Sequence, residues 1–196
     1  ITVQPAGRCF NVERDGTILG AAIEQGIGLP YGCKDGACGS CKSRLVEGRV
    51  IHGAHQAKAL SETEEAEGWV LTCCATPLSD VVLQSRHITD ESAFPVRKMP
   101  TRVSGLEKKS DDVMWLKLQL PSNDMFRYHA GQYIEFLLKD GTRRAFSLDN
   151  PPHVDNVLEL HLRLIPGGQF TEYVFNEMPD KAIMRIEGPL GSFFLR

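Results

Sequence analysis

Short apolar segments, separated by glycine and proline, make up the first 88 residues of the chain. Over 18–23 the apolar residues recur with the period of a helix, and Gly26 is placed to end that helix. Ser61 followed by Glu64 forms a capping-box pattern, which predicts a second short helix. Strands are expected at 2–4, 9–12, 45–46, 50–51, 69–72 and 81–84.

From Thr101 onward the pattern changes to alternation of apolar and polar residues. Over 114–120 and again over 158–164, every second residue is Leu or Met, and most residues between them are polar or charged. This period of two predicts half-buried antiparallel strands, and several of them in so short a segment predict a small barrel. One helix is expected at 171–176. The preceding segment 87–100 is polar and aperiodic, which is typical of a linker.

The sequence therefore predicts an α+β domain over 1–88, a linker over 89–98 and an all-β barrel over 99–196. Hydrophobic content of 42% and charged content of 24% are those of an ordinary globular protein. No apolar run is long enough to predict a membrane span. The net charge of −3 gives no argument for a nucleic-acid partner, and the acidic run 62–67 is expected to be a solvated helix face.

Four cysteines carry the candidate chemistry of the first domain. Cys33, Cys38 and Cys41 lie in a C-x4-C-x2-C run, and Cys73 follows some thirty residues later. Thiolates of one short loop can wrap a metal cluster only if the backbone turns tightly, and glycine and other small residues punctuate this loop. Backbone N–H groups of such a loop can point at the sulfur atoms and tune a reduction potential.

Other interpretations of the six cysteines fit the spacing less well. A zinc site usually shows paired C-x2-C knuckles or Cys/His pairs, and only one C-x2-C occurs. A disulfide framework is typical of short secreted chains, and this chain has 196 residues with no signal-peptide pattern. A Rieske centre needs two His ligands, but His52 and His55 are not spaced beside a cysteine as that would require.

The C-x4-C-x2-C…C spacing resembles that of plant-type [2Fe–2S] ferredoxins. The order of strands and helices over 1–86 also resembles their β-grasp fold. The resemblance implies a [2Fe–2S] cluster, which carries one electron at a time, with Cys33, Cys38, Cys41 and Cys73 as ligands. Free cysteines and such a cluster fit a reducing compartment, so a cytoplasmic protein is expected.

On spacing alone, either Cys73 or Cys74 could be the fourth ligand. Because adjacent residues of a strand point to opposite faces, only one of the two is expected to face the cluster. Similar ferredoxins carry L-T-C or L-A-C at the ligand, which favours Cys73. Cys9 and Cys74 are then expected to be small buried residues or free thiols.

A second set of motifs lies in the predicted barrel. The tetrapeptide R-x-F-S at 144–147 is preceded by HAGQYI at 129–134 and followed by HLRLIPGGQFT at 161–171 and EGPLGSFFLR at 187–196. This set, in this order, resembles the FAD-binding barrel of the ferredoxin–NADP reductase superfamily, where the first motif usually reads R-x-Y-S. Phe146 in place of tyrosine lacks the hydroxyl group and keeps the ring.

The resemblance implies a role for each motif. Arg144 would pair with the FAD diphosphate, because a guanidinium fork suits phosphate oxygens. Phe146 would pack on the isoalloxazine, and the hydroxyl of Ser147 would lie near flavin N5. The other implied FAD contacts are the strand beside the diphosphate, His161, Leu162 and Arg163, and N–H groups at a helix start, Gly168, Gln169, Phe170 and Thr171.

The structural alternative is that the arginines are ordinary exposed strand residues and Phe146 belongs to the core. Any single motif is compatible with that alternative. Four ordered motifs on one β-rich segment favour the flavin interpretation.

An iron–sulfur domain followed by a flavin barrel is the order of oxygenase reductases, such as those of benzoate dioxygenase, phenol hydroxylase and methane monooxygenase. The segments GIGLPYGC, LTCCATPLSD and GPLGSFFLR are most similar to reductases of CDP-6-deoxyglucoseen synthesis. Such reductases normally continue into a nicotinamide-binding α/β domain. No βαβ unit with a Gly-rich turn occurs in the sequence, so that domain is expected to be absent from this chain.

The resemblance implies a flavin- and iron–sulfur-dependent oxidoreductase. Electrons would pass from NAD(P)H, bound by the absent domain, through FAD and the [2Fe–2S] cluster to a terminal oxygenase or hydroxylase, or to a PMP-dependent sugar dehydrase. No protein nucleophile or general acid is required, so no catalytic side chain is predicted. Two other classes stay open: an electron carrier whose barrel only docks a partner, and a zinc-binding interaction module.

Overall fold

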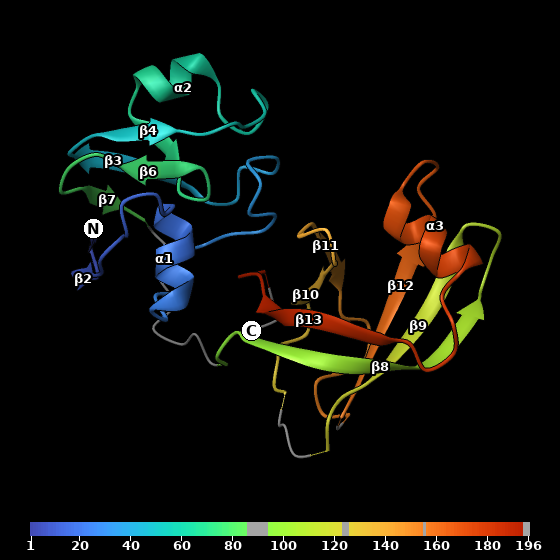
Figure 1. The fold of residues 1–196 in the computed structure, drawn as a ribbon. Helices are drawn as coiled ribbons and strands as arrows, with labels where there is room; N and C mark the ends of the chain where they lie inside the picture. Colours follow the sequence, from blue (N-terminus) through green and yellow to red (C-terminus); the bar gives the residue numbers. More distant parts are fainter. Residues whose placement is uncertain (86–93, 123–125, 155, 194–196) are drawn as a thin grey trace. The chain divides into compact units, whose positions relative to one another are not determined.

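A computed structural model describes residues 1–85, 94–122, 126–154 and 156–193 (Figure 1). Contacts divide the chain into two compact units: Ile1–Ala93 with Gly191–Phe193, and a second unit that comprises Phe94–Leu190 and the C-terminal residues. Of the predicted linker 89–98, residues 89–93 lie outside the described residues. Strand β8 (Arg97–Lys108) begins at Arg97, inside the predicted linker.

The first unit is built on a mixed five-stranded sheet in the order β2-β1-β7-β3-β5. Its strands are β1 (Thr2–Gln4), β2 (Arg8–Cys9), β3 (Lys42–Glu47), β5 (Trp69–Leu71) and β7 (Val82–Gln84). Strands β1 and β7 run parallel, with Thr2 opposite Val82, and the other strand pairs of this sheet are antiparallel. A separate two-stranded sheet pairs β4 (Val50–His52) with β6 (Ala75–Pro77).

Two short helices flank these strands (Figure 1). Helix α1 (Ile18–Glu24) buries Ile18 and Leu19 in the core of the unit and ends before Gly26, which has φ +71°, as the sequence predicts. Helix α2 (Glu62–Ala66) begins at Ser61 with the predicted capping box and contacts β5. None of the helices in the described ranges is long and apolar enough to cross a membrane.

The second unit is a six-stranded antiparallel sheet in the order β11-β10-β13-β8-β9-β12. Besides β8, its strands are β9 (Val113–Gln119), β10 (Tyr133–Leu137), β11 (Arg143–Ser147), β12 (Val157–Arg163) and β13 (Ile183–Leu190). The two end strands, β11 and β12, contact each other, so the sheet curls toward a barrel. Helix α3 (Gln169–Asn176) lies beside the end of β12 (Figure 1).

Alternation of apolar and polar residues shapes the core of this unit as predicted. The Leu and Met side chains of β9 and β12 are buried, and Leu116 lies opposite Leu160 in the register of the two strands. Helix α3 starts two residues earlier than predicted, because Gly168 is its N-cap. The hydroxyl of Thr171 closes the turn before the helix: it accepts from Ile165 N and donates to Gly168 O.

Two strand predictions in the first unit were wrong. Strand β2 covers Arg8–Cys9 only, and of the two alternatives predicted for Cys9 the structure has the free thiol, which is exposed. Strand β5 ends at Leu71, and the chain then turns, with the N–H group of Cys74 donating to Leu71 O at 3.0 Å. This early strand end changes the geometry of the cysteine pair that follows.

Candidate functional site

The first unit brings the four cysteines of the predicted cluster site together in two pairs. Cys41 Sγ lies 3.3 Å from Cys73 Sγ. The two residues are close because Cys41 directly precedes β3, Cys73 follows the end of β5 by two residues, and these two strands pair with each other. Cys33 and Cys38 form the second pair, with the N–H group of Cys33 donating to Cys38 Sγ at 3.4 Å. A [2Fe–2S] cluster takes two protein ligands on each of its two irons, so this arrangement fits the cluster.

Backbone donors surround the sulfur atoms of the loop. The N–H group of Ala37 donates to Cys33 Sγ at 3.4 Å, and that of Ser40 donates to Cys38 Sγ at 3.5 Å. Burial raises the pKa of Cys38, but hydrogen bonds with Ser40 and Cys33 outweigh it and lower the pKa to about 7. Such donors stabilise the thiolate, which is the form in which cysteine binds metals. Within the described ranges, no three His, Cys, Asp or Glu side chains surround a site for a single ion.

Cys73 and Cys74 do not point to opposite sides as the strand pattern predicts. They lie in the turn after β5, and their Sγ atoms are only 3.5 Å apart. Cys73 is buried against Cys41, whereas Cys74 is half-buried and faces Gly36 of the loop. Cys73 therefore has the position of a partner for Cys41, and Cys74 packs behind the loop.

In the second unit, the R-x-F-S residues lie on the edge strand β11. Arg144 and Phe146 share one face of the strand, opposite Phe136 and Ile134 of β10, and Ser147 is exposed on the other face. The ring of Phe146 packs on Phe136 with centroids 5.9 Å apart. Arg144 is exposed, and its Nη1 donates to Arg143 O at 2.8 Å.

The start of helix α3 meets this strand through a ring contact. The centroids of Phe146 and Phe170 lie 5.7 Å apart, so the first turn of α3 is held beside the R-x-F-S strand. N–H groups in the first turn of a helix lack intrahelical partners and attract anions. The side chains of Phe170 and Leu162 are buried, and the Thr171 hydroxyl donates to Gly168 O at 3.1 Å. These residues can therefore reach a ligand only through their backbone.

The predicted residues of β12 lie at the other end of the sheet order, where His161 and Arg163 are exposed and Leu162 between them is buried. His161 Nδ1 lies 3.1 Å from Asp149 Oδ2, and Arg163 Nε donates to Asp112 Oδ2 at 3.0 Å. Both predicted side chains thus have carboxylate partners, whereas Arg144 is exposed beside the aromatic rings. Strand β11 thus contacts β12 and, through the Phe146 and Phe170 rings, the start of α3, so three motifs far apart in the sequence lie near one another.

Sequence reasoning missed the groups that hold β11 and β12 in place. Asn150, which follows β11, accepts from Glu159 N and donates to Val157 O of β12, each at 2.9 Å. The hydroxyl of Tyr128 donates to Asn150 O at 2.8 Å, and burial, together with the charge of Glu159, raises the pKa of Tyr128 to about 12. This network joins the end of the R-x-F-S strand to β12.

Arg143, the residue before the motif arginine, was also missed. Its Nη1 donates to Glu135 Oε2 of β10 at 3.1 Å and to Glu187 Oε2 of β13. The Glu135 side chain is only 6% exposed, and Arg143 is 43% exposed. A glutamate in the apolar strand sequence YIEFL was the one sequence signal for such a pair.

Arg143→Ala is expected to lower the free energy of unfolding of the second unit by about 1–3 kcal/mol, because the buried Glu135 carboxylate would lose a charged partner. The exposure of Arg143 keeps the effect below that of a fully buried pair. Urea denaturation followed by circular dichroism would measure it. Arg143→Ala combined with Glu135→Gln should recover much of the loss, and an unchanged midpoint for Arg143→Ala would show that water already solvates Glu135.

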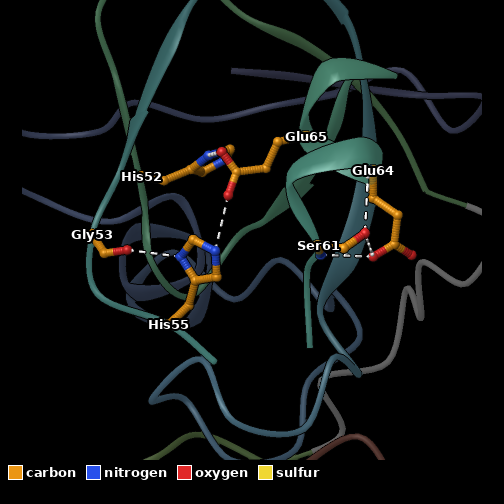
Figure 2. A network of polar contacts seen from close by, with 6 residues as sticks. All are labelled: His52, Gly53, His55, Ser61, Glu64 and Glu65. Carbon is orange, nitrogen blue, oxygen red and sulfur yellow. Dashed lines mark hydrogen bonds and ion pairs between the residues drawn. The ribbon is translucent and has the colours of Figure 1, made fainter. Parts of the chain in front are cut away.

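The sequence predicted that the acidic run of α2 is a solvated helix face, but two of its glutamates make specific contacts. Glu64 completes the capping box with Ser61 and pairs with Lys42 Nζ at 2.5 Å. Glu65 contacts both His52 and His55 (Figure 2). Two glutamates of the run therefore have specific partners in the first unit.

Comparison with known families assigns both units. Residues 1–78 match the 2Fe-2S iron-sulfur cluster binding domain, and residues 100–195 match the oxidoreductase FAD-binding domain. The chain thus consists of a β-grasp domain of the [2Fe–2S] family followed by a barrel of the FAD-binding oxidoreductase family.

Several relatives that match the whole chain are named reductases or reductase components. The chain is 36% identical over 196 residues to CDP-6-deoxy-L-threo-D-glycero-4-hexulose-3-dehydrase reductase of Yersinia pseudotuberculosis, covering all of this chain and 59% of the relative. It is 39% identical over 200 residues to the phenol 2-monooxygenase reductase component DmpP of Pseudomonas sp., covering 100% and 56%. The crystal structure of the Amycolatopsis cytochrome P450 reductase GcoB matches with a TM-score of 0.84 at 33% identity, covering 100% and 59%.

The chain therefore spans 56–59% of the length of these curated relatives. Both cofactors that the sequence resemblance implies, a [2Fe–2S] cluster and FAD, are those of the two matched families.

Proposed function

We propose that this chain is the flavin and iron–sulfur part of an NAD(P)H-dependent electron-transfer reductase. The observation that supports the proposal is the gathering of the predicted residues into two separate groups, one in each unit. In the first unit, four cysteines come together in two pairs. In the second, the R-x-F-S strand and a helix start meet at the Phe146–Phe170 contact. The domain boundaries that we propose remain 1–88 and 99–196.

Cys33, Cys38, Cys41 and Cys73 are the proposed ligands of the [2Fe–2S] cluster. Support comes from the 3.3 Å approach of Cys41 to Cys73 and from the N–H groups of Ala37 and Ser40, which point at Cys33 and Cys38. Hydrogen bonds to cluster sulfurs raise the reduction potential, because they stabilise the added negative charge. This chain thus supplies both the ligands and part of the tuning.

The FAD site that we propose lies between the edges of β11 and β12 and the start of α3. Arg144 would bind the diphosphate together with backbone groups at the start of α3, Gly168–Thr171, where the N–H group of Gly168 already donates to Ile165 O at 2.8 Å and those of the next three residues would be the donors. Phe146 would support the isoalloxazine, Ser147 would lie near its N5 atom, and His161–Arg163 would run beside the diphosphate through their backbone. When bound, the flavin accepts two electrons and releases them one at a time, which is chemistry of the cofactor.

The electron acceptor that we propose is a partner protein, either a terminal oxygenase or a PMP-dependent sugar dehydrase. The names of relatives support both, since they include a phenol monooxygenase component and a hexulose-dehydrase reductase. The electron donor would be NAD(P)H. We also propose a cytoplasmic location, because the free thiol of Cys9 is exposed and such thiols persist in a reducing compartment.

The visible spectrum of the purified chain tests the proposal, with iron, sulfide and flavin assayed on the same sample. We expect overlapping flavin and iron–sulfur bands, with about one FAD and two irons per chain. Flavin without iron and sulfide would contradict the cysteine assignment. A cluster without flavin, even after incubation with excess FAD, would instead favour an electron carrier whose barrel only docks a partner.

A further inference from the structure

One carboxylate of α2 holds two histidines of the segment that starts in β4. Glu65 Oε2 lies 3.1 Å from His52 Nδ1, and Glu65 Oε1 lies 2.9 Å from His55 Nε2. The other ring nitrogen of His55, Nδ1, donates to Gly53 O at 2.9 Å (Figure 2). Both carboxylate oxygens are therefore engaged, and the imidazole ring of His55 is fixed at both of its nitrogens.

These three side chains are partly sheltered from water. The side chains of His52 and His55 are 16% and 17% exposed, and that of Glu65 is 33% exposed. The two imidazole rings also contact each other edge to face, with centroids 5.8 Å apart. Because polar contacts are stronger away from solvent, the trio restrains its segment more than an exposed ion pair would.

The histidine segment is hydrogen-bonded to both cysteine-bearing segments of the unit. The N–H group of Gln56 donates to Gly36 O of the cluster loop at 3.0 Å. The N–H group of Gly53 donates to Cys74 O at 2.8 Å. A restraint on residues 52–56 is thus passed to the loop that carries Cys33 and Cys38 and to the turn that carries Cys73.

Gly36 is pressed closely against His55. It has φ +75°, and a Cβ atom at this position would come within 2.8 Å of both His55 Cβ and Cys74 Sγ. The next residue, Ala37, donates its N–H group to Cys33 Sγ. Because the two residues are consecutive, the torsion angles of Gly36 set the direction of this N–H group.

We propose that Glu65 is a positioning residue for the cluster loop, acting through His55. The carboxylate of Glu65 holds the ring of His55 in place. His55 and Gln56 in turn restrain Gly36, and the conformation of Gly36 directs the Ala37 N–H group toward Cys33. The function of Glu65 would be to maintain the hydrogen bond from Ala37 to the sulfur of Cys33, which would keep the reduction potential of the cluster higher than it would be without that bond. The inference rests on the proposed assignment of Cys33 as a cluster ligand.

The test compares Glu65→Ala with Glu67→Ala in the full chain. Both variants remove one negative charge from the same helical segment, but Glu67 is exposed and is not among the contacts of the two histidines. We expect Glu65→Ala to shift the potential of the cluster to a more negative value and to release iron to a chelator several-fold faster. Loss of a nearby negative charge alone would shift the potential in the opposite direction, so the sign separates positioning from electrostatics.

A double-mutant cycle tests whether Glu65 acts through His55. In a His55→Ala background, Glu65→Ala should shift the potential no further, because the connection is already broken. Glu65→Gln keeps an acceptor for His55, so we expect a negative shift smaller than that of Glu65→Ala, and this variant serves if Glu65→Ala does not fold.

A positive shift, or a shift equal to that of Glu67→Ala, would overturn the inference, as would full additivity with His55→Ala. These outcomes are distinct from failure of the proposed function. If the unmodified chain shows no iron and no electron paramagnetic resonance signal after reduction, the cluster assignment itself is wrong.

Discussion

Replacing Cys73 with serine is expected to leave the chain without its iron–sulfur cluster, whereas replacing Cys74 should leave the cluster in place. Cys73 is 7% exposed and its Sγ atom lies 3.3 Å from that of Cys41, so the substitution would remove one of the two proposed ligands in this pair. Cys74 faces Gly36 behind the loop and is not paired with Cys41. Iron and sulfide content, with the visible spectrum, measure the result.

The two variants are matched, because each replaces one neighbouring sulfur by oxygen. Circular dichroism of both would show whether the fold persists without the cluster. The comparison is a stringent test of which cysteine is the fourth ligand, because the two sulfur atoms are only 3.5 Å apart. Loss of the cluster from Cys74→Ser and its retention in Cys73→Ser would move the fourth ligand to Cys74.

Phe146→Ala is expected to weaken FAD binding at least tenfold, while iron and sulfide stay at the level of the unmodified chain. The substitution removes the ring that would support the isoalloxazine and breaks the contacts of β11 with Phe136 and with Phe170 of α3. A tenfold loss corresponds to about 1.4 kcal/mol, within the range for loss of an aromatic contact. Flavin fluorescence during titration of the apoprotein measures the dissociation constant.

Phe175→Ala is the matched control, since Phe175 is also a half-buried ring against the core of the second unit and is not among the predicted flavin contacts. It should cost some stability and leave flavin affinity within about threefold of the unmodified chain. If Phe146→Ala removes the cluster and the flavin equally, the assignment of one cofactor to each unit is wrong.

Local signals in the sequence predicted much of the fold. The period of two over 114–120 and 158–164 directly reports burial on one face, and the structure has β9 and β12 there. The capping box at Ser61 and the stop at Gly26 depend on a few adjacent residues, so both were recognisable without tertiary context.

Features that depend on distant parts of the chain were not predictable in this way. The strand before Cys73 ends at Leu71 because a turn closes there, and no residue in WVLTCCA marks that turn. Glu65 looked like one of several solvated acids until the fold placed two histidines beside it. Arg143 reaches Glu187 across 44 positions, a pairing that only the sheet order creates.

The parallel pairing of β1 with β7 sets the order of events when the protein is made. The first strand of the iron–sulfur unit cannot take its place in the sheet until Val82 has been synthesised, roughly 80 residues later. At ribosomal rates of about 5–20 residues per second, the delay is about 4–16 seconds. Within this interval, Cys41 precedes its proposed partner Cys73 by 32 residues, or about 2–6 seconds at the same rates, and through this time the thiols of Cys33, Cys38 and Cys41 have to stay reduced and unmodified if they are to bind iron.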